Sequence, residues 1–246
     1  MNTRTTYRLA ATTLAAAALA ATAGFTALGS IFEYPQILKE PTTDILALYR
    51  AHQGAVTGWF LVLVISAALL APAGVLLGRI AAVTGSGNTG RWIAGIGIGA
   101  AAVQVTGLSR WVLFVPGISA DATVTGHTAA AHARFEQLHF WLGTIVGETI
   151  GYALTAGFTV LVATTVSRAL APRWLTWSGY AAAALIATGV LIPLGLGAAS
   201  LTNFAGYVLW CLWLIAIAVL LWRAARANAG GSSARPPEGA VCGSSD

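Results

Sequence analysis

The stretch F-E-Q-L-H-F-W-L-G-T-I-V-G-E-T-I-G, from Phe135 to Gly151, decides the fold of this chain. It begins in a polar region and continues into a long apolar segment. Glu148 follows Leu138 by ten residues, so it lies roughly 15 Å along a helix that rises 1.5 Å per residue. An ionised carboxylate at that depth in a bilayer costs about 2.5–3.5 kcal/mol. The stretch therefore predicts a membrane-spanning helix whose carboxylate needs either a partner or a function.

The composition extends this interpretation to the whole chain. Of its 246 residues, 57% are hydrophobic and 9% are charged, whereas about 25% of the residues in a soluble domain are charged. Six apolar segments are long enough to cross a bilayer as helices, near Leu9–Ile31, Gly54–Ile80, Trp92–Pro116, Leu138–Val166, Leu175–Leu196 and Leu201–Trp222. We expect an all-α bundle of six transmembrane helices over residues 1–226. The Gly/Ser/Pro-rich residues 227–246 are expected to form a disordered cytoplasmic tail.

The positions of Lys and Arg predict the topology. With a cytoplasmic N-terminus, nine of these residues lie on the inner side and four on the outer side. This bias predicts that both termini of a multi-pass inner-membrane protein are cytoplasmic. The basic residues are spread singly, so we expect no nucleic-acid partner. Arg4 and Arg8 before an Ala-rich run also leave open a cleaved signal peptide.

The first outer loop is patterned like a short interfacial helix. Thr42 or Thr43 is placed to cap it, and Asp44 falls in its first turn. We expect its apolar face to lie on the bilayer surface, and that face comprises Ile45, Leu46, Leu48 and Tyr49.

Two features of the last helices concern packing. Pro193, followed by Gly195 and Gly197, predicts a kink or an early stop in the fifth helix. Trp210 and Trp213 lie too deep for an interfacial belt, and we expect them to pack against a neighbouring helix.

The fourth helix has two faces. Gly143, Gly147 and Gly151 recur every four residues in line with His139, a small-xxx-small pattern that permits close approach of another helix or association with a second copy of the chain. Glu148 lies on the other face, which it shares with Thr144, Tyr152 and Thr155.

The third helix supplies a partner for Glu148. Arg110 precedes Pro116 by six residues, which is about 9 Å along a helix, and its long side chain reaches toward Glu148. A latch that fixes helix register, or an Arg110 that snorkels outward, explains the same pattern. Polar groups gather in the outer half of the bundle, which favours an outward-opening pocket. The residues that we expect to bind its ligand are Arg110, Glu148, Glu33, His139, Gln104, Tyr152 and Asn203.

The remaining motifs predict neither a metal site nor a cofactor. His52 and His139 both begin helices on the outer side, where haem ligation is an alternative to ordinary solvation. His127 and His132 are five residues apart, a poor spacing for a metal pair. Phosphate loops, nucleophile elbows and dinucleotide fingerprints are absent from the sequence.

Several segments together resemble a bacterial multi-span family classified only as a domain of unknown function. The resemblance implies a six-span inner-membrane protein and directs attention to Glu33, Arg110, Glu148 and Asn203, but it implies no activity. Relatives often have His directly after the Glu, where this chain has Thr149. The segments are I-F-E-Y-P-Q-I-L-K-E-P (31–41), L-S-R-W-V-L-F-V-P (108–116), L-G-T-I-V-G-E-T-I-G-Y (142–152), P-R-W-L-T-W (172–177) and N-F-A-G-Y-V-L-W-C-L-W-L-I (203–215).

Three functional hypotheses follow. The first is binding of a small lipophilic or amphipathic ligand, with Arg110 and Glu148 holding its polar group. The second is a membrane isomerase or cyclase in which Glu148 is the general acid/base on an isoprenoid or lipid. The third is a small transporter or accessory subunit, which the apolar inner half of the bundle disfavours because a carrier needs access from both sides.

Overall fold

A computed structural model describes residues 2–84 and 87–230, and all regular structure in these ranges is helical. Six helical spans are long and apolar enough to cross a membrane, so the prediction of a six-helix membrane bundle is confirmed. The elements are α1 (Thr3–Ile31), η1 (Gln36–Lys39), α2 (Thr42–Ala51), α3 (Gln53–Ala68), α4 (Leu70–Val83), α5 (Gly87–Leu113), α6 (Val115–Asp121), α7 (Thr128–Leu138), η2 (His139–Ile150), α8 (Gly151–Val162), η3 (Ala163–Ser167), α9 (Arg168–Leu170), α10 (Arg173–Ala187), η4 (Thr188–Leu194) and α11 (Gly197–Gly230).

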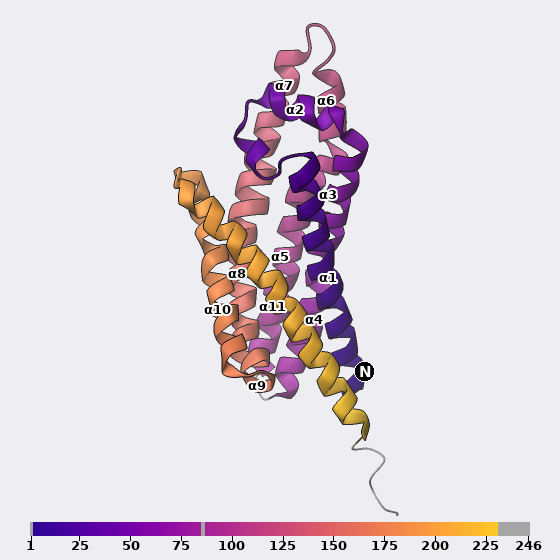
Figure 1. Ribbon diagram of the computed structural model, residues 1–246, viewed down its shortest axis with the longest axis vertical. Coiled ribbons are helices and arrows are strands. Elements are labelled where there is room, and N and C mark those ends of the chain that lie inside the picture. The colour runs from indigo at the N-terminus through magenta and orange to yellow at the C-terminus, as the bar shows by residue number, and fades with distance from the viewer. Residues whose placement is uncertain (1, 85–86, 231–246) are drawn as a thin grey trace, which may run out of the picture.

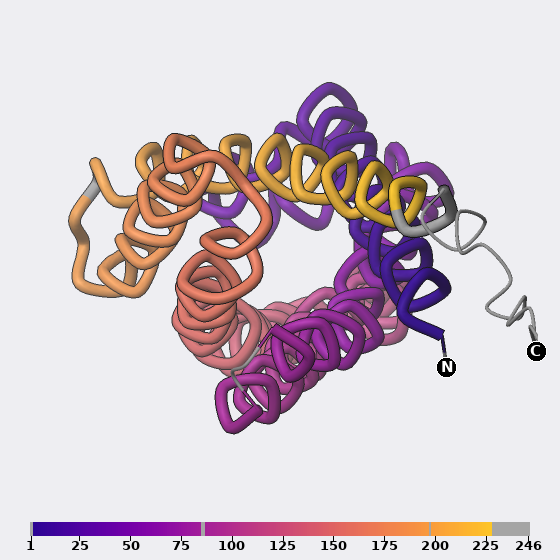
Figure 2. The backbone as a smooth tube through the Cα atoms, turned by 90° about the horizontal axis from the view of Figure 1, so that it is seen from below, coloured from indigo at the N-terminus to yellow at the C-terminus, as the bar shows by residue number. Residues whose placement is uncertain are grey.

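The spans form a closed ring. α1 packs against α3, α4 and α11; α11 packs against α10; α10 packs against α8; and α8 and η2 pack against α5, which returns to α3 and α4. Figure 2 shows this ring from below. Figure 1 shows the start of α1 and the end of α11 at one end of the bundle, which we call the terminal end. The opposite, capped end carries η1, α2, α6 and α7.

The terminal half is one packed core to which all six spans contribute. Leu14, Ile93, Phe158 and Trp213 are among its fully or almost fully buried side chains. Close helix approach depends on small residues, as expected where packing rather than the hydrophobic effect holds helices together in a membrane. For example, a Cβ at Gly78 of α4 would collide with the backbone carbonyl of Gly90 in α5.

The capped half has a separate, aromatic core formed by α1, α2, α3, α5, α6 and α7. Trp111 lies at its centre, with its ring stacked 4.8 Å from that of Phe60 and edge-on 5.2 Å from that of Phe32. Such pairs stabilise a core beyond the apolar area that they bury.

The short helix of the first loop exists, as α2, but its orientation was predicted wrongly. Ile45, Leu46 and Tyr49 are buried against the protein rather than facing a bilayer surface. The predicted cap is also wrong. Pro41 precedes the helix without a side-chain cap, and Thr42 instead donates a hydrogen bond to Glu136 Oε1 at 2.9 Å. The apolar face of α2 packs on the aromatic core, and the sequence periodicity alone could not distinguish this partner from a bilayer surface.

The fourth span departs from a regular α-helix. Its stretch η2, His139–Ile150, is a π-helix of 12 residues, and η3 is a second π-helical stretch. The Thr149 hydroxyl donates back five residues to the Thr144 carbonyl at 2.8 Å. π-Helices are rare and occur preferentially at functional sites, and the one in η2 contains Glu148.

The predicted break in the fifth span is confirmed. α10 ends at Ala187, the 3₁₀-helix η4 contains Pro193, and Gly195 adopts a left-handed φ of 79°. The last helix continues to Gly230, four residues into the expected tail. The rest of that expected tail lies outside the described residues.

Candidate functional site

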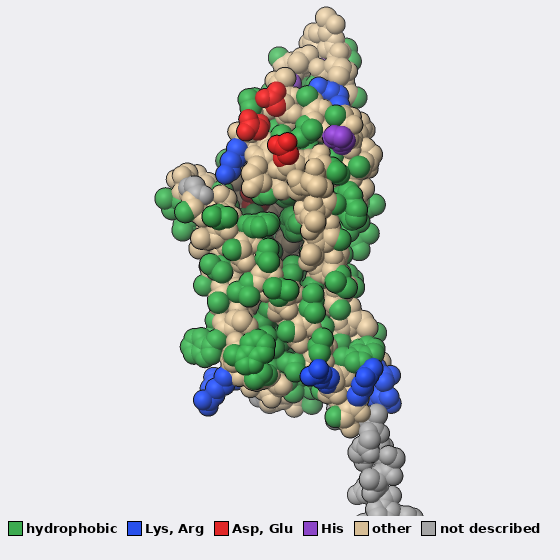
Figure 3. Space-filling model, viewed as in Figure 1, with side chains coloured by type: hydrophobic (Ala, Val, Ile, Leu, Met, Phe, Trp, Pro, Cys, Tyr) green, Lys and Arg blue, Asp and Glu red, His purple; other side chains and the backbone are tan. Residues whose placement is uncertain are grey.

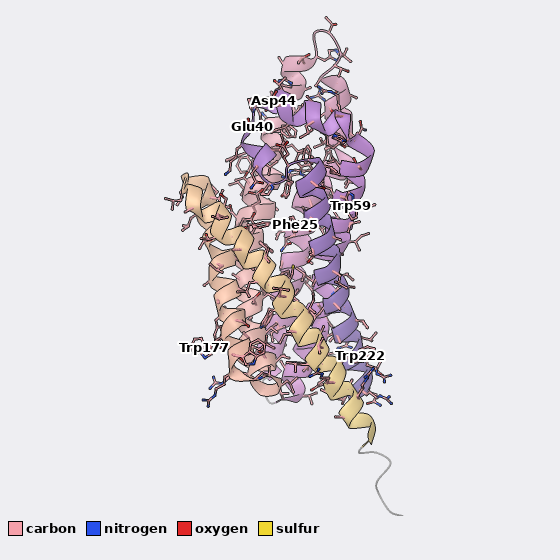
Figure 4. All side chains as sticks on the ribbon, viewed as in Figure 1. Phe25, Glu40, Asp44, Trp59, Trp177 and Trp222 are labelled. Carbon is pink, nitrogen blue, oxygen red and sulfur yellow. The ribbon has the colours of Figure 1, made fainter. Side chains whose placement is uncertain are left out.

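The two halves of the molecule differ most where α1 and α11 separate. The two helices contact each other in the terminal half, as far as a hydrogen bond between the side chains of Thr22 and Cys211. Beyond it, α11 leans away from α1 (Figure 1). Figure 3 shows a recess at this level, below the acidic side chains of the capped end. Phe25, labelled in Figure 4, lies on α1 beside it and stacks on Tyr34 at 6.1 Å.

Three tyrosines gather at this level. Tyr34, Tyr152 and Tyr207 are each enclosed by protein atoms, yet each side chain keeps some accessible surface. This combination is typical of side chains that line an internal space. The rings of Tyr152 and Tyr207 lie 5.7 Å apart, and that of Tyr34 lies 5.4 Å from that of Phe60. Burial, reinforced by the charge of Glu148, raises the pKa of Tyr34 well above that of a free phenol, and Arg110 opposes this shift.

Arg110 is the most deeply buried charged side chain of this group. Only 3% of its surface is exposed. Its Nη1 donates to the Gly107 carbonyl at 2.6 Å, while its Nε is buried without a hydrogen-bond partner. Its guanidinium lies against Gly143, where an added Cβ would be 2.7 Å from Nη2. Glycine at position 143 therefore makes room for the guanidinium.

Glu148 is near Arg110 but does not form a direct salt bridge with it. Within residues 2–84 and 87–230, the salt bridge joins Arg134 and Asp121 at 3.1 Å. The charges of Arg110 and Glu148 interact at longer range, and both interact with Tyr34 and Tyr152. The sequence therefore identified two neighbouring charges, but not the gap between them.

The two amide side chains expected at the site connect helices. Gln104 Nε2 donates to Thr155 Oγ1 at 2.6 Å, which joins α5 to α8. Asn203 Nδ2 donates to the Ile186 carbonyl at 2.8 Å, which joins α11 to α10. Each position lies beside the tyrosine cluster, and these bonds hold the helices that line it.

Of the remaining candidates, His139 lies in the cluster around Arg110, whereas Glu33 and His52 are exposed. His139 is half-buried, stacks on Phe135 at 5.8 Å, and leaves its Nδ1 buried without a partner. The charge of Arg110 acts on it, so it belongs to the same cluster. Glu33 is exposed, with a left-handed φ of 53°, and His52 is exposed at the junction of α2 and α3. Groups of three or more metal-ligating side chains are not found in the described part of the chain.

The glycine face of the fourth span is occupied within the chain. Gly147 and Gly107 pack backbone to backbone, with a Cβ at Gly147 falling 2.9 Å from the Gly107 Cα, and Gly151 lies against Gln104. The close approach predicted from the spacing is confirmed, and the helix that approaches is α5. Association of copies through this face stays a prediction.

Trp210 and Trp213 behave as expected for packing residues. Both are buried, and Trp213 donates from its indole nitrogen to the Leu175 carbonyl at 2.9 Å. The aromatic residues that sequence analysis did not select are Phe25, Tyr34 and Tyr207. Their only signal is that Tyr34 and Tyr207 lie inside segments that carry the family resemblance.

The comparisons with known proteins name a family and give no activity. Neither the curated proteins nor the solved structures contain a match. The family model described as "Domain of unknown function (DUF4386)" matches residues 9–218, which include every side chain of the cluster around Arg110 and at least part of each of the six spans. The chain therefore belongs to the DUF4386 family.

Proposed function

We propose that this protein binds a small lipophilic or amphipathic molecule in the recess between α1 and α11, with Arg110 and Glu148 holding its polar group. The observation that carries the proposal is Arg110 itself. A guanidinium that is 97% buried, with its Nε unpaired and no carboxylate of the described residues in direct contact, is costly in a low-dielectric interior. A latch that fixed helix register would pair the two charges. A ligand that inserts between them would give each charge a polar partner.

The shape of the molecule supports entry from the side. The aromatic core of the capped half closes that end of the bundle, and the core of the terminal half closes the other. The recess faces outward between α1 and α11 (Figure 3), at a level where α11 exposes the apolar side chains of Leu201, Phe204 and Val208. A ligand that partitions into the bilayer reaches such a recess without crossing the capped end.

The charges define the polar group of the ligand. Arg110 only donates hydrogen bonds, and an ionised Glu148 only accepts them. A group that bridges the two therefore needs an acceptor at one end and a donor at the other, as in a hydroxyl-bearing or zwitterionic headgroup. The apolar part would lie against Phe25 and the three phenol rings.

The test is retention of ligand through purification. We expect protein purified in mild detergent to carry a lipophilic molecule that mass spectrometry detects after extraction, and Arg110→Ala to lose it. Arg134→Ala is the matched control, because Arg134 is an exposed arginine paired with Asp121. Exchange of the charges, Arg110→Glu with Glu148→Arg, should not restore retention. Equal ligand content in Arg110→Ala and Arg134→Ala would refute the proposal, and full rescue by the exchange would indicate a latch.

An enzyme is the second candidate, and the position of Glu148 favours it. This carboxylate lies in a π-helix, beside three phenols and next to a space that a lipid can enter. As a general acid/base it would move a proton on an isoprenoid or lipid. Conversion of a candidate lipid that is lost in Glu148→Gln, while ligand retention persists, would distinguish catalysis from binding. Absence of any product across a broad lipid panel would count against catalysis.

A transporter is less well supported. The terminal half is filled by a core to which all six spans contribute, and its buried polar side chains, such as Thr159 and Ser167, bond within the protein. A pathway through it would require that core to open. We expect liposomes containing the protein to show no ligand flux with or without a pH gradient, and pH-coupled flux would reverse this ranking.

We also propose that the terminal end faces the cytoplasm of a bacterial inner membrane. Its support is the distribution of arginine. Reporter fusions after Gly230 and within the segment between α6 and α7 should give opposite signals, with the cytoplasmic signal from the first.

A further inference from the structure

The terminal end carries a strong positive charge that no carboxylate of the described chain balances. Acidic residues of the described ranges all lie in the capped half or its recess, from Glu33 to Glu148. In Figure 3 the visible Asp and Glu side chains lie at the capped end, whereas the charged side chains visible at the terminal end are basic. Within residues 2–84 and 87–230, eight arginines lie at the terminal end, namely Arg4, Arg8, Arg79, Arg91, Arg168, Arg173, Arg223 and Arg226.

A cavity of about 270 Å³ lies within this positive region, between the start of α1 and the end of α4. Its lining combines one guanidinium, three hydroxyl-bearing side chains and two apolar ones, namely Arg79, Thr3, Thr6, Tyr7, Ile80 and Val83.

Tyr7 is the informative member of this set. Its side chain is 7% exposed, and in the described part of the chain its hydroxyl forms no hydrogen bond. A hydroxyl that lines a cavity and has no partner in the protein is free to donate a hydrogen bond to a molecule that binds there. Thr6 is also 7% exposed, but its hydroxyl already donates to the Asn2 carbonyl at 3.3 Å.

The chemistry of the lining fits a phosphate group. Arginine and hydroxyl donors are the usual partners of phosphate oxygens, and the N-terminus of α1, which begins at Thr3 beside the cavity, adds a favourable dipole. The Nε atoms of Arg4 and Arg8 are buried without partners on the same turns of α1. They strengthen the positive potential around the cavity.

The surroundings indicate a lipid as the source of the phosphate. Trp92, Trp174 and Trp177 are each at least 67% exposed at the terminal end, and Figure 4 shows Trp177 there. Exposed tryptophans of this kind mark the headgroup level of a membrane. Val83, which lines the cavity, is 72% exposed and gives an acyl chain an apolar surface next to the polar lining.

We propose that the cavity lined by Arg79 and Tyr7 binds the phosphate of an anionic phospholipid from the leaflet at the terminal end. This site lies at the opposite end of the bundle from the recess beside Arg110, so each proposal stands or fails separately. The alternative is a diffuse positive surface that sets topology and holds no lipid in particular. A defined site needs the Tyr7 hydroxyl, whereas a diffuse surface does not.

Native mass spectrometry of the full-length protein tests the difference, with phosphatidylglycerol compared with phosphatidylcholine. We expect a preference for phosphatidylglycerol that falls about tenfold in Tyr7→Phe, which removes one hydrogen bond to a charged group, and at least as far in Arg79→Ala. The control is Arg173→Ala, which removes an arginine of the same end that does not line the cavity.

Three results would overturn the proposal. The first is an equal loss in Arg79→Ala and Arg173→Ala with none in Tyr7→Phe, which would show a diffuse surface. The second is displacement of phosphatidylglycerol by millimolar inorganic phosphate as readily as by lipid, which would show a free-anion site. The third is no preference in the wild-type protein. Thermal unfolding of each variant checks that Tyr7→Phe and Arg79→Ala remain folded.

Discussion

The terminal and capped halves of this bundle are built from the same six spans but are packed differently. In the terminal half, small and apolar side chains from every span meet in one core, and helices approach as closely as Gly78 and Gly90 permit. In the capped half, the aromatic core involves only part of the ring. The helices α10 and α11 stand apart from it, and polar side chains line the space between.

This difference separates stability from function along the length of the molecule. Close packing leaves no room for a ligand between the helices of the terminal core, and the cavity beside Tyr7 lies at the end of the bundle, between α1 and α4. Arg110 Nε and His139 Nδ1 are buried without partners beside the recess. If the division is correct, substitutions in the terminal core should change unfolding, and substitutions around Arg110 should change ligand retention.

The largest expected effect is on the terminal core. Trp213→Ala removes a side chain that is 1% exposed, together with its hydrogen bond to Leu175. Loss of a buried aromatic side chain costs about 3–5 kcal/mol of unfolding free energy. Unfolding in detergent, followed by helical circular dichroism, measures it. Leu212→Ala is the control on the same helix because Leu212 is 60% exposed, and similar losses in the two variants would contradict the proposed role of this core.

The next effect should appear in ligand retention with little change in stability. Gly143→Ala places a methyl group 2.7 Å from Arg110 Nη2, so the guanidinium must move while its charge is kept. We expect retention of the co-purified ligand to fall about tenfold, as for loss of one charge-assisted hydrogen bond. Gly157→Ala is matched, because its added Cβ would have no neighbour within 4 Å. Unchanged retention in Gly143→Ala would show that the position of Arg110 is not what holds the ligand.

Much of this architecture follows from the sequence because bilayer thickness sets the length of each span. The six spans, the break at Pro193 and the burial of Trp213 were each predicted correctly from local pattern. The close packing of Gly147 was predicted as well, because glycine spacing alone permits it. These features depend on residues near one another in sequence or on a single physical constraint.

The features that sequence analysis missed depend on distant parts of the chain. The apolar face of α2 was assigned to the bilayer because the buried aromatic core around Trp111 assembles from four separate spans. The π-helix η2, which packs against α5, was not predicted from the sequence. Arg110 and Glu148 were both identified, but only the fold shows that Tyr34 and Tyr207, from opposite ends of the chain, lie beside them.

A smaller effect concerns the ionisation of Tyr34. The folded protein raises its pKa above the 10.0 of a free phenol, so the unfolded chain releases this proton first as pH rises. The contribution of Tyr34 to stability is therefore complete below pH 10.0 and declines above it. The phenolate absorbance of the wild type minus that of Tyr34→Phe should show no Tyr34 ionisation near pH 10.0 in native protein.

Two further variants test whether Tyr34 senses both charges of the recess. Glu148→Gln should lower the pKa of Tyr34, and Arg110→Ala should raise it further, because the carboxylate disfavours the phenolate and the guanidinium favours it. Shifts in the same direction for both variants would show that they act by altering burial instead of charge.

The smallest effect should come from the surface of the capped half. Arg134 and Asp121 form a salt bridge of 3.1 Å, but their side chains are 55% and 43% exposed. Solvent screening limits such a pair to about 0–1 kcal/mol. A double-mutant cycle with Arg134→Ala and Asp121→Ala should give a coupling energy in that range and no change in ligand retention. A larger coupling, or a loss of ligand, would mean that the surface of the capped half supports the recess, and the division between a stabilising half and a binding half would have to be drawn elsewhere.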